Sequence, residues 1–125
     1  MYLLDTNTVI DFFNAKLPEN AKNLLLTIEK PKISVITRIE LFSSTKIPIQ
    51  EKNILESFVN QAKVYDTINL DIINQSIFIR QNHKIKLPDA IIAATALVYN
   101  LTIISRNVSD FKNIQGVQVI DPHSL

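Results

Sequence analysis

Short runs of β-branched or large apolar residues alternate with longer segments of helical spacing along this 125-residue chain, and this alternation constrains the fold more than any other feature. We expect strands at residues 2–4, 32–36, 64–68 and 101–105, and a weaker one at 117–120. We expect helices at residues 6–14, 18–29, 37–42, 48–62, 70–80 and 89–100. This order predicts an α/β fold in which a mostly parallel sheet is sandwiched by helices through right-handed crossovers.

Length, composition and charge limit the class of protein. A hydrophobic share of 46% in 125 residues fits one globular domain, which we expect to span residues 1–125. The formal net charge of +1 is too small for a non-specific nucleic-acid binder, so any contact with RNA or DNA must be local. The chain has no signal-peptide pattern and no membrane-length apolar run, and we expect a soluble cytoplasmic protein without a membrane partner.

Scarce residue types exclude several kinds of site. The chain has no Cys, which excludes disulfides, thiolate zinc sites and Cys nucleophiles. Its single Gly, Gly116, excludes glycine-rich phosphate loops. Two His, His83 and His123, are too few for a three-His metal site, and no G-x-S-x-G motif supplies a serine nucleophile. The chemistry that remains is that of carboxylates.

Three acidic residues stand at the expected carboxyl edge of the sheet, where open parallel sheets bind ligands. Asp5 ends the first strand, Glu40 starts the helix after the second strand, and Asp89 starts the helix before the fourth. Each acid alone is explained by helix capping or by the helix dipole. Glu40, for example, completes a capping box that starts at Thr37.

Together the three acids favour a metal site. They adjoin strongly apolar segments rather than solvated helix faces, and converging carboxylates repel one another unless a cation neutralises them. Oxygen ligands without His or Cys favour Mg²⁺, for which Mn²⁺ substitutes. Such ions activate water and stabilise the charge that develops on a phosphodiester.

Four motifs follow one another along the chain: L-L-D-T-N at residues 3–7, S-V-I-T-R-I-E-L at 34–41, L-P-D-A-I-I-A-A-T-A at 87–96 and I-I-S-R-N-V-S-D-F at 103–111. In this order and at these separations they resemble the PIN-domain ribonucleases and, in length and spacing, the VapC-type toxins of prokaryotic toxin–antitoxin pairs. The resemblance covers nearly the whole chain. It implies a three-layer α/β/α sandwich and Mg²⁺-dependent endonucleolytic cleavage of RNA.

The resemblance also implies roles for individual residues. The matching motifs supply three acidic metal ligands, which are also the catalytic residues: Asp5, Glu40 and Asp89. Short polar side chains would hold these ligands by hydrogen bonds: Thr6, Asn7 and Ser105. A metal-activated water would attack the phosphodiester in line, and which carboxylate acts as general base stays open.

A fourth acidic position departs from the family pattern. Many relatives have Asp where this chain has Asn107. Asp110 either compensates through a water molecule or only caps the next turn. We therefore expect one well-occupied Mg²⁺ rather than two.

Basic residues near the motifs have two interpretations each. Arg106 either contacts an RNA phosphate or is an ordinary surface arginine. Lys84 and Lys86, with His83, either hold the RNA backbone beside Asp89 or form a solvated connector.

The resemblance implies two protein partners, a cognate antitoxin that holds the toxin inactive and a second copy in a homodimer. Phe12 and Phe13 would line a groove for the antitoxin or the dimer contact, although core packing explains at least one of them. We expect His123 to be exposed and without a role.

Three other interpretations stay open. A non-catalytic PIN-like interaction module would explain Asn107 as the mark of a degraded site. A stand-alone PIN nuclease would need no antitoxin. A phospho-acceptor domain is disfavoured, because the third strand ends in Thr67 and Ile68 without an acceptor and no suitable lysine follows the fourth strand.

Overall fold

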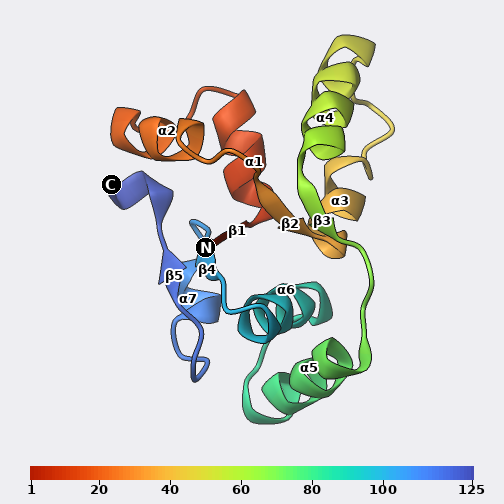
Figure 1. Ribbon diagram of the computed structural model, residues 1–125, viewed down its shortest axis with the longest axis vertical. Helices are drawn as coiled ribbons and strands as arrows, with labels where there is room; N and C mark the ends of the chain where they lie inside the picture. Colours follow the sequence, from red (N-terminus) through yellow and green to blue (C-terminus); the bar gives the residue numbers. More distant parts are fainter.

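Five parallel strands form the central layer of the computed structural model, which describes residues 1–125 (Figure 1). They lie in the order β3-β2-β1-β4-β5, and every neighbouring pair is parallel. Their bounds are β1 (Tyr2–Leu4), β2 (Lys32–Ser34), β3 (Lys63–Tyr65), β4 (Thr102–Ile104) and β5 (Val119–Ile120). The predicted parallel sheet is confirmed, and β1 lies at its centre.

Helices cover both faces of the sheet. Their bounds are α1 (Thr6–Phe13), α2 (Glu19–Leu26), α3 (Val35–Leu41), α4 (Ile49–Gln61), α5 (Leu70–Asn82), α6 (Leu87–Val98) and α7 (Val108–Phe111), followed by the 3₁₀ turn η1 (Pro122–Ser124). Figure 1 shows α1 to α4 on one side of the sheet and α5, α6 and α7 on the other. No helix is both long and apolar enough to cross a bilayer.

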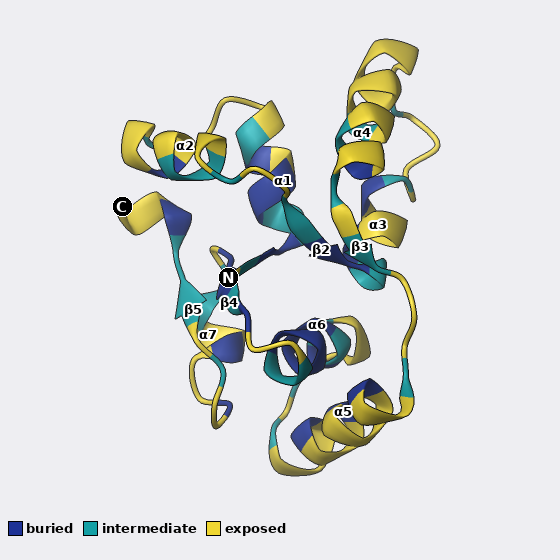
Figure 2. Cartoon of the chain, viewed as in Figure 1, coloured by how far each residue is buried: buried dark blue, intermediate teal, exposed yellow.

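Side chains of the strands belong to two separate hydrophobic cores, one on each face of the sheet. Leu3 and Ile103 pack with α5, α6 and α7, whereas Leu4 and Ile104 pack with α1, α3 and α4. Successive residues of a strand point to opposite faces, so strands covered on both faces must be apolar at every position. Figure 2 shows a largely buried β1, more exposed edge strands β3 and β5, and a largely buried α6, beside α4 and α5 whose outer sides are exposed.

The start of α3 differs from the prediction. The helix begins at Val35, and the N-cap is Ser34, whose side chain accepts a hydrogen bond from the Thr37 backbone N–H at 3.1 Å. The N-cap preference of serine outweighs the strand preference of Val35 and Ile36, so β2 is shorter than expected. Thr37 is therefore inside the helix, and the capping-box explanation of Glu40 is wrong.

Other boundaries moved by a few residues. The third strand ends at Tyr65 rather than residue 68, α5 continues to Asn82, and α6 begins at Leu87 with Pro88 in its first turn. The sequence did not predict α7, because four residues are too few to carry a periodic pattern.

Candidate metal centre at the carboxyl edge of the sheet

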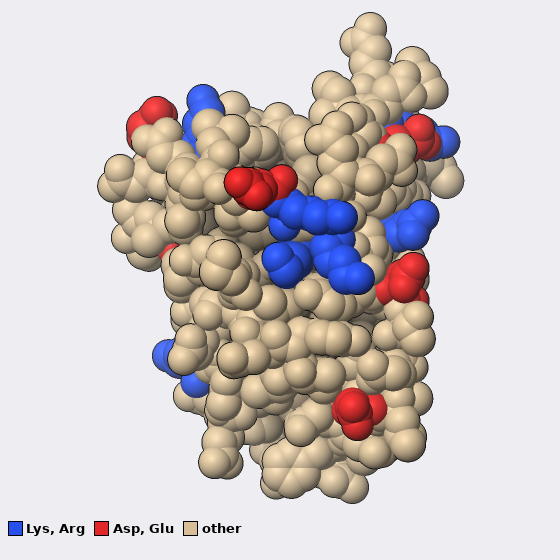
Figure 3. Space-filling view, viewed as in Figure 1, with Lys and Arg blue, Asp and Glu red and all other residues tan.

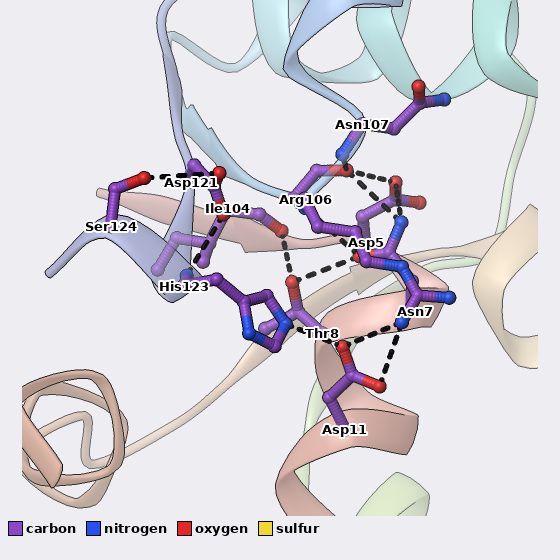
Figure 4. Close-up of polar contacts among 11 residues, drawn as sticks. Asp5, Asn7, Thr8, Asp11, Ile104, Arg106, Asn107, Asp121, His123 and Ser124 are labelled. Carbon is purple, nitrogen blue, oxygen red and sulfur yellow. Dashed lines mark hydrogen bonds and ion pairs between the residues drawn. The ribbon is translucent and has the colours of Figure 1, made fainter. Parts of the chain in front are cut away.

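Asp5 follows β1 and lies at the centre of a hydrogen-bond network (Figure 4). The residue is only 4% exposed. Its Oδ1 accepts from the backbone N–H of Thr6 at 2.9 Å, which makes Asp5 the N-cap of α1. Its Oδ2 accepts from the Ser105 hydroxyl at 2.7 Å and from the Asn7 amide at 3.2 Å.

The sheet register brings Ser105 to Asp5. Leu4 of β1 pairs with Ile104 of β4, so the residues that follow these two strands stand side by side. The Ser105 hydroxyl also accepts from the Asn7 side-chain amide at 3.2 Å. Two of the side chains predicted to support Asp5 therefore contact it directly.

Glu40 reaches the same edge through Thr6. The Thr6 hydroxyl donates to Oε1 of Glu40 at 2.6 Å, and it lies 3.1 Å from the hydroxyl of Thr37. Both contacts join α1 to α3. Thr6 thus supports Asp5 through its backbone and Glu40 through its side chain.

Asp89 lies half-buried in the first turn of α6, and the charges of the other acids act on it. Its pKa is raised to about 6, mainly because burial disfavours the charged form. The remaining increase comes from the charges of three carboxylates: Asp5, Asp110 and Glu40. Lys86 lowers the same pKa. Four acids from four segments of the chain therefore converge electrostatically.

Burial also raises the pKa of Asp5, and the charge of Glu40 raises it further. The hydrogen bonds from Ser105, Thr6 and Asn7 oppose that increase, because they stabilise the carboxylate form. These three hydrogen bonds favour the ionised form of Asp5 at a site where burial and a neighbouring charge disfavour it.

A divalent cation would relieve the repulsion among these acids. The donors are carboxylate oxygens with no His or Cys among them, a set that fits a hard ion such as Mg²⁺. No three acidic or histidine side chains stand close enough together to form a ready-made ligand cage. The structure brings the negative charges of these acids near one another, and their fit to a hard cation rests on the carboxylate oxygens they supply.

The model of the PIN domain family matches residues 2–117 of the chain. The chain belongs to the PIN domain family. No curated protein sequence matches it.

Solved structures share the fold of this PIN domain. A toxin–antitoxin complex from Klebsiella pneumoniae contains a chain that is 35% identical, with 98% of each chain covered and a TM-score of 0.78. A DNA-bound VapBC from Salmonella typhimurium is 26% identical over 96% of each chain, with a TM-score of 0.80. VapBC2 from Rickettsia felis, bound to a promoter DNA fragment, is 24% identical over 95% of this chain and 96% of that chain, with a TM-score of 0.80. The predicted α/β/α fold and the resemblance to VapC-type PIN domains are confirmed.

Asn107 and Asp110, the two candidates for a fourth polar position, form a hydrogen-bonded pair. The side-chain amide of Asn107 donates to Oδ2 of Asp110 at 2.7 Å, and the Asn107 backbone N–H donates to the Ser105 hydroxyl at 2.9 Å. Asp110 lies in the first turn of α7, and its charge raises the pKa of Asp89. Asn107 therefore ties Asp110 to the network around Ser105.

Arg106 is a surface arginine, which is one of its two predicted alternatives, and its contact with an RNA phosphate stays a prediction. Its Nη1 donates to both carboxylate oxygens of Asp11, at 3.0 and 2.9 Å, while its side chain stays 56% exposed. His123 is exposed, as expected, but its Nε2 lies 2.8 Å from Oδ2 of the same carboxylate. The exposure expected for His123 is confirmed, and its contact with Asp11 is one that the sequence did not predict.

Sequence reasoning missed Asp11. The available signal was a lone acid among the apolar residues Val9, Ile10, Phe12 and Phe13 of the first helix. Its two partners lie 95 and 112 residues away, so no local pattern identifies them.

The basic connector divides between two surfaces. Lys86 lies near enough to Asp89 to lower its pKa. Lys84 and His83 instead line a hollow with apolar residues of α5 and α6, and none of the four acids lines that hollow. Figure 3 shows a further cluster of Lys and Arg side chains over the region of β2 and β3, where Lys32 and Lys63 are paired in register. Basic charge is thus concentrated locally on this nearly neutral protein.

Phe13 lines a groove rather than the core. It is 38% exposed and packs edge-to-face on Phe58 of α4 and on Phe12, with ring centroids 5.5 and 5.2 Å apart. The groove runs between α1 and α4, and Glu40 is also part of its wall. An apolar groove therefore adjoins the acidic group.

Proposed function

We propose that this PIN domain, residues 1–125, is a metal-dependent endoribonuclease and the toxin of a toxin–antitoxin pair that acts in the cytoplasm. The observation that carries the proposal is the hydrogen-bond network at the carboxyl edge of the sheet, which holds the buried Asp5 carboxylate and reaches Glu40 through Thr6. Neighbouring acids that are partly or fully buried and repel one another suit a bound cation. The family match and the fold shared with VapBC complexes support the same function.

In this proposal one Mg²⁺, or Mn²⁺ in its place, is held by three carboxylates: Asp5, Glu40 and Asp89. When bound, the ion supplies an activated water and neutralises charge on the RNA phosphodiester. The protein's own contribution is orientation. The Ser105 hydroxyl and the Asn7 amide fix Asp5, and the Thr6 hydroxyl fixes Glu40.

RNA cleavage by protein purified free of antitoxin tests the proposal. With Mg²⁺, Asp5→Asn and Asp89→Asn should each lower the cleavage rate at least about 100-fold, because even residues that only support metal ligands cost 10- to 100-fold. Asp71→Asn is the matched control, since Asp71 also lies in the first turn of a helix but is exposed. No cleavage by the unaltered protein, or equal rates for all four proteins, contradicts the proposal.

The groove between α1 and α4 is the surface that suits the antitoxin. Ile10, Phe13 and Ile54 line it and are 42%, 38% and 52% exposed. Exposed apolar side chains in a groove are suited to an amphipathic segment of a partner. Glu40 lines the same groove, so an occupant would reach the metal centre and block it. The relatives crystallised as toxin–antitoxin complexes support such a partner.

Binding to the small protein encoded by the neighbouring reading frame tests this partner. Ile54→Asp should weaken binding at least about tenfold, because it places a charge in a desolvated interface. Phe78→Asp is the matched control, since Phe78 is 59% exposed on α5, on the other side of the sheet. If no neighbouring protein binds, the stand-alone nuclease is the better interpretation.

The proposal also includes a homodimer. Large apolar side chains are exposed on and beside α5 and at the start of α6: Ile68, Ile73, Ile77 and Leu87. They line one hollow together, a surface that a second copy would cover. This surface lies on the opposite helical layer from the groove, so a dimer leaves the groove free.

A further inference from the structure

Asp11 is a buried carboxylate that belongs to no acidic group. The residue is 2% exposed in the middle of α1, and its oxygens contact only two side chains, Arg106 and His123 (Figure 4). A buried carboxylate is stable only when it is paired and hydrogen-bonded. Both partners come from the far end of the chain, so Asp11 joins α1, the segment after β4 and the C-terminal turn η1.

The segment that Arg106 belongs to is the one that holds Asp5. The backbone N–H of Arg106 donates to Oδ1 of Asn7 at 3.2 Å, and the backbone N–H of Asn107 donates to the Ser105 hydroxyl at 2.9 Å. Asn7 and Ser105 both donate to Oδ2 of Asp5. Residues 105–107 therefore form a strap whose inner side is hydrogen-bonded to the Asp5 network.

The Arg106 side chain makes the only ion pair between this strap and α1, beside the hydrogen bonds that join Asn107 to Asp110 and the Ser105 backbone N–H to the carbonyl of Ile120. Arg106 is 56% exposed and makes no ion pair other than the one with Asp11. Without Asp11 its guanidinium would be free in solvent. His123 lies on the other side of Asp11, and its backbone N–H donates at 2.9 Å to Asp121, which caps η1.

From these contacts we infer that Asp11 is a positioning residue for the metal centre, which it serves by holding Arg106 and thereby the strap of residues 105–107 against Asp5. The part that concerns metal affinity rests on the proposed function. The part that concerns the strap is a property of the metal-free protein, so it can be tested alone.

Amide hydrogen exchange in EDTA tests the strap. In Asp11→Asn and in Arg106→Ala, exchange at the Arg106 and Asn107 amides should accelerate about fivefold to tenfold, the equivalent of roughly one net hydrogen bond. The Ile103 amide, which donates to the carbonyl of Gln118 in the sheet, is the internal control and should not change. Unchanged exchange at Arg106 and Asn107 overturns the inference. Arg106 is exposed, so its alanine variant keeps the test available if Asp11→Asn does not fold.

Calorimetric titration with Mn²⁺ tests the consequence for the metal. Asp11→Asn should raise the dissociation constant about tenfold, at the low end of the cost of residues outside the ligand set. Arg106→Ala should raise it equally, and the double variant should add nothing further, because both changes break one connection. A purely structural Asp11 would lower the melting temperature and leave the dissociation constant unchanged, which contradicts the inference.

His123→Ala is the matched control, because it removes the other partner of Asp11 and leaves Arg106 in place. It should change neither the exchange rates nor the Mn²⁺ dissociation constant. If it reproduces Asp11→Asn, the C-terminal turn rather than Arg106 carries the effect and the inference is wrong. Failure of the unaltered protein to bind Mn²⁺ counts against the proposed function, whereas the exchange experiment still decides the role of Asp11.

Discussion

The carboxylates at the carboxyl edge of the sheet are held in surroundings that disfavour their charge. Asp5 is buried at the end of a central strand, and Asp89 lies in the first turn of the most buried helix. Their pKa values are raised by burial first and by one another second. A cost of this kind at neighbouring carboxylates supports the proposed metal site.

Asp89 predicts a specific dependence of stability on pH in the absence of metal. Its pKa is raised from 3.8 to about 6 in the folded protein, so its contribution to the free energy of unfolding is complete below pH 3.8 and is lost as pH rises through 6. Asp89→Asn does not titrate at this position. In EDTA, the urea midpoint of the unaltered protein should therefore fall relative to that of Asp89→Asn between pH 4.5 and 7. A difference that stays constant over this interval would contradict the assigned pKa.

Ser105 predicts a separate effect on metal affinity. Its hydroxyl lowers the pKa of Asp5 more than any other group does, through a hydrogen bond of 2.7 Å. Ser105→Ala should raise that pKa further and weaken Mn²⁺ binding at pH 7 about tenfold. Ser109→Ala, at an exposed position of α7, is the control and should bind Mn²⁺ as the unaltered protein does. Equal affinities for the two variants would remove Ser105 from the site.

At the scale of single elements, the acidic residues are positioned by the ends of the strands and by the helices that follow them. Ser34 begins α3, which carries Glu40. The apolar motifs made the acids and their edge of the sheet predictable, because strand and helix periods are local. The start of α3 was misplaced, since Val35 and Ile36 favour a strand until the serine cap is considered. The Asp11 network was missed because its contacts join residues about a hundred positions apart.

The corrected start of α3 makes Ser34 a testable cap. Ser34→Ala leaves the Thr37 backbone N–H without its partner and should lower the free energy of unfolding by about 1 kcal/mol. Urea denaturation measures this loss, and Ser109→Ala should change the same quantity by less than about 0.5 kcal/mol. Thr37→Ala and Ser34→Ala distinguish the two caps, because the predicted capping box required Thr37. If Ser34→Ala leaves the free energy of unfolding unchanged, Thr37 rather than Ser34 is the cap.

At the scale of the whole molecule, the sheet separates two apolar surfaces with different expected occupants. The groove between α1 and α4 lies with Glu40 on one side, and the hollow around α5 lies on the other. Alternating strands and helices made this layered fold predictable from sequence. The strand order was not predicted, because pairing β1 with β4 joins residues a hundred positions apart and leaves no local signal.

The α5 surface predicts how the chain self-associates. Ile77→Asp should convert a homodimer to a monomer, because the charge would be buried without a partner in the interface. Light scattering measures the molar mass, and Ile54→Asp in the groove should leave it unchanged. A monomer in the unaltered protein, or a dimer that survives Ile77→Asp, would assign this surface to something else.

The central claim is that acids from separate segments of the chain together bind one divalent cation. Calorimetric titration of the metal-free protein with Mn²⁺ at pH 7 tests it most directly. The account predicts one ion bound per chain, binding lost in Asp5→Asn and in Asp89→Asn, and binding retained in Asp71→Asn. Absence of binding, or the same affinity in all four proteins, would contradict it.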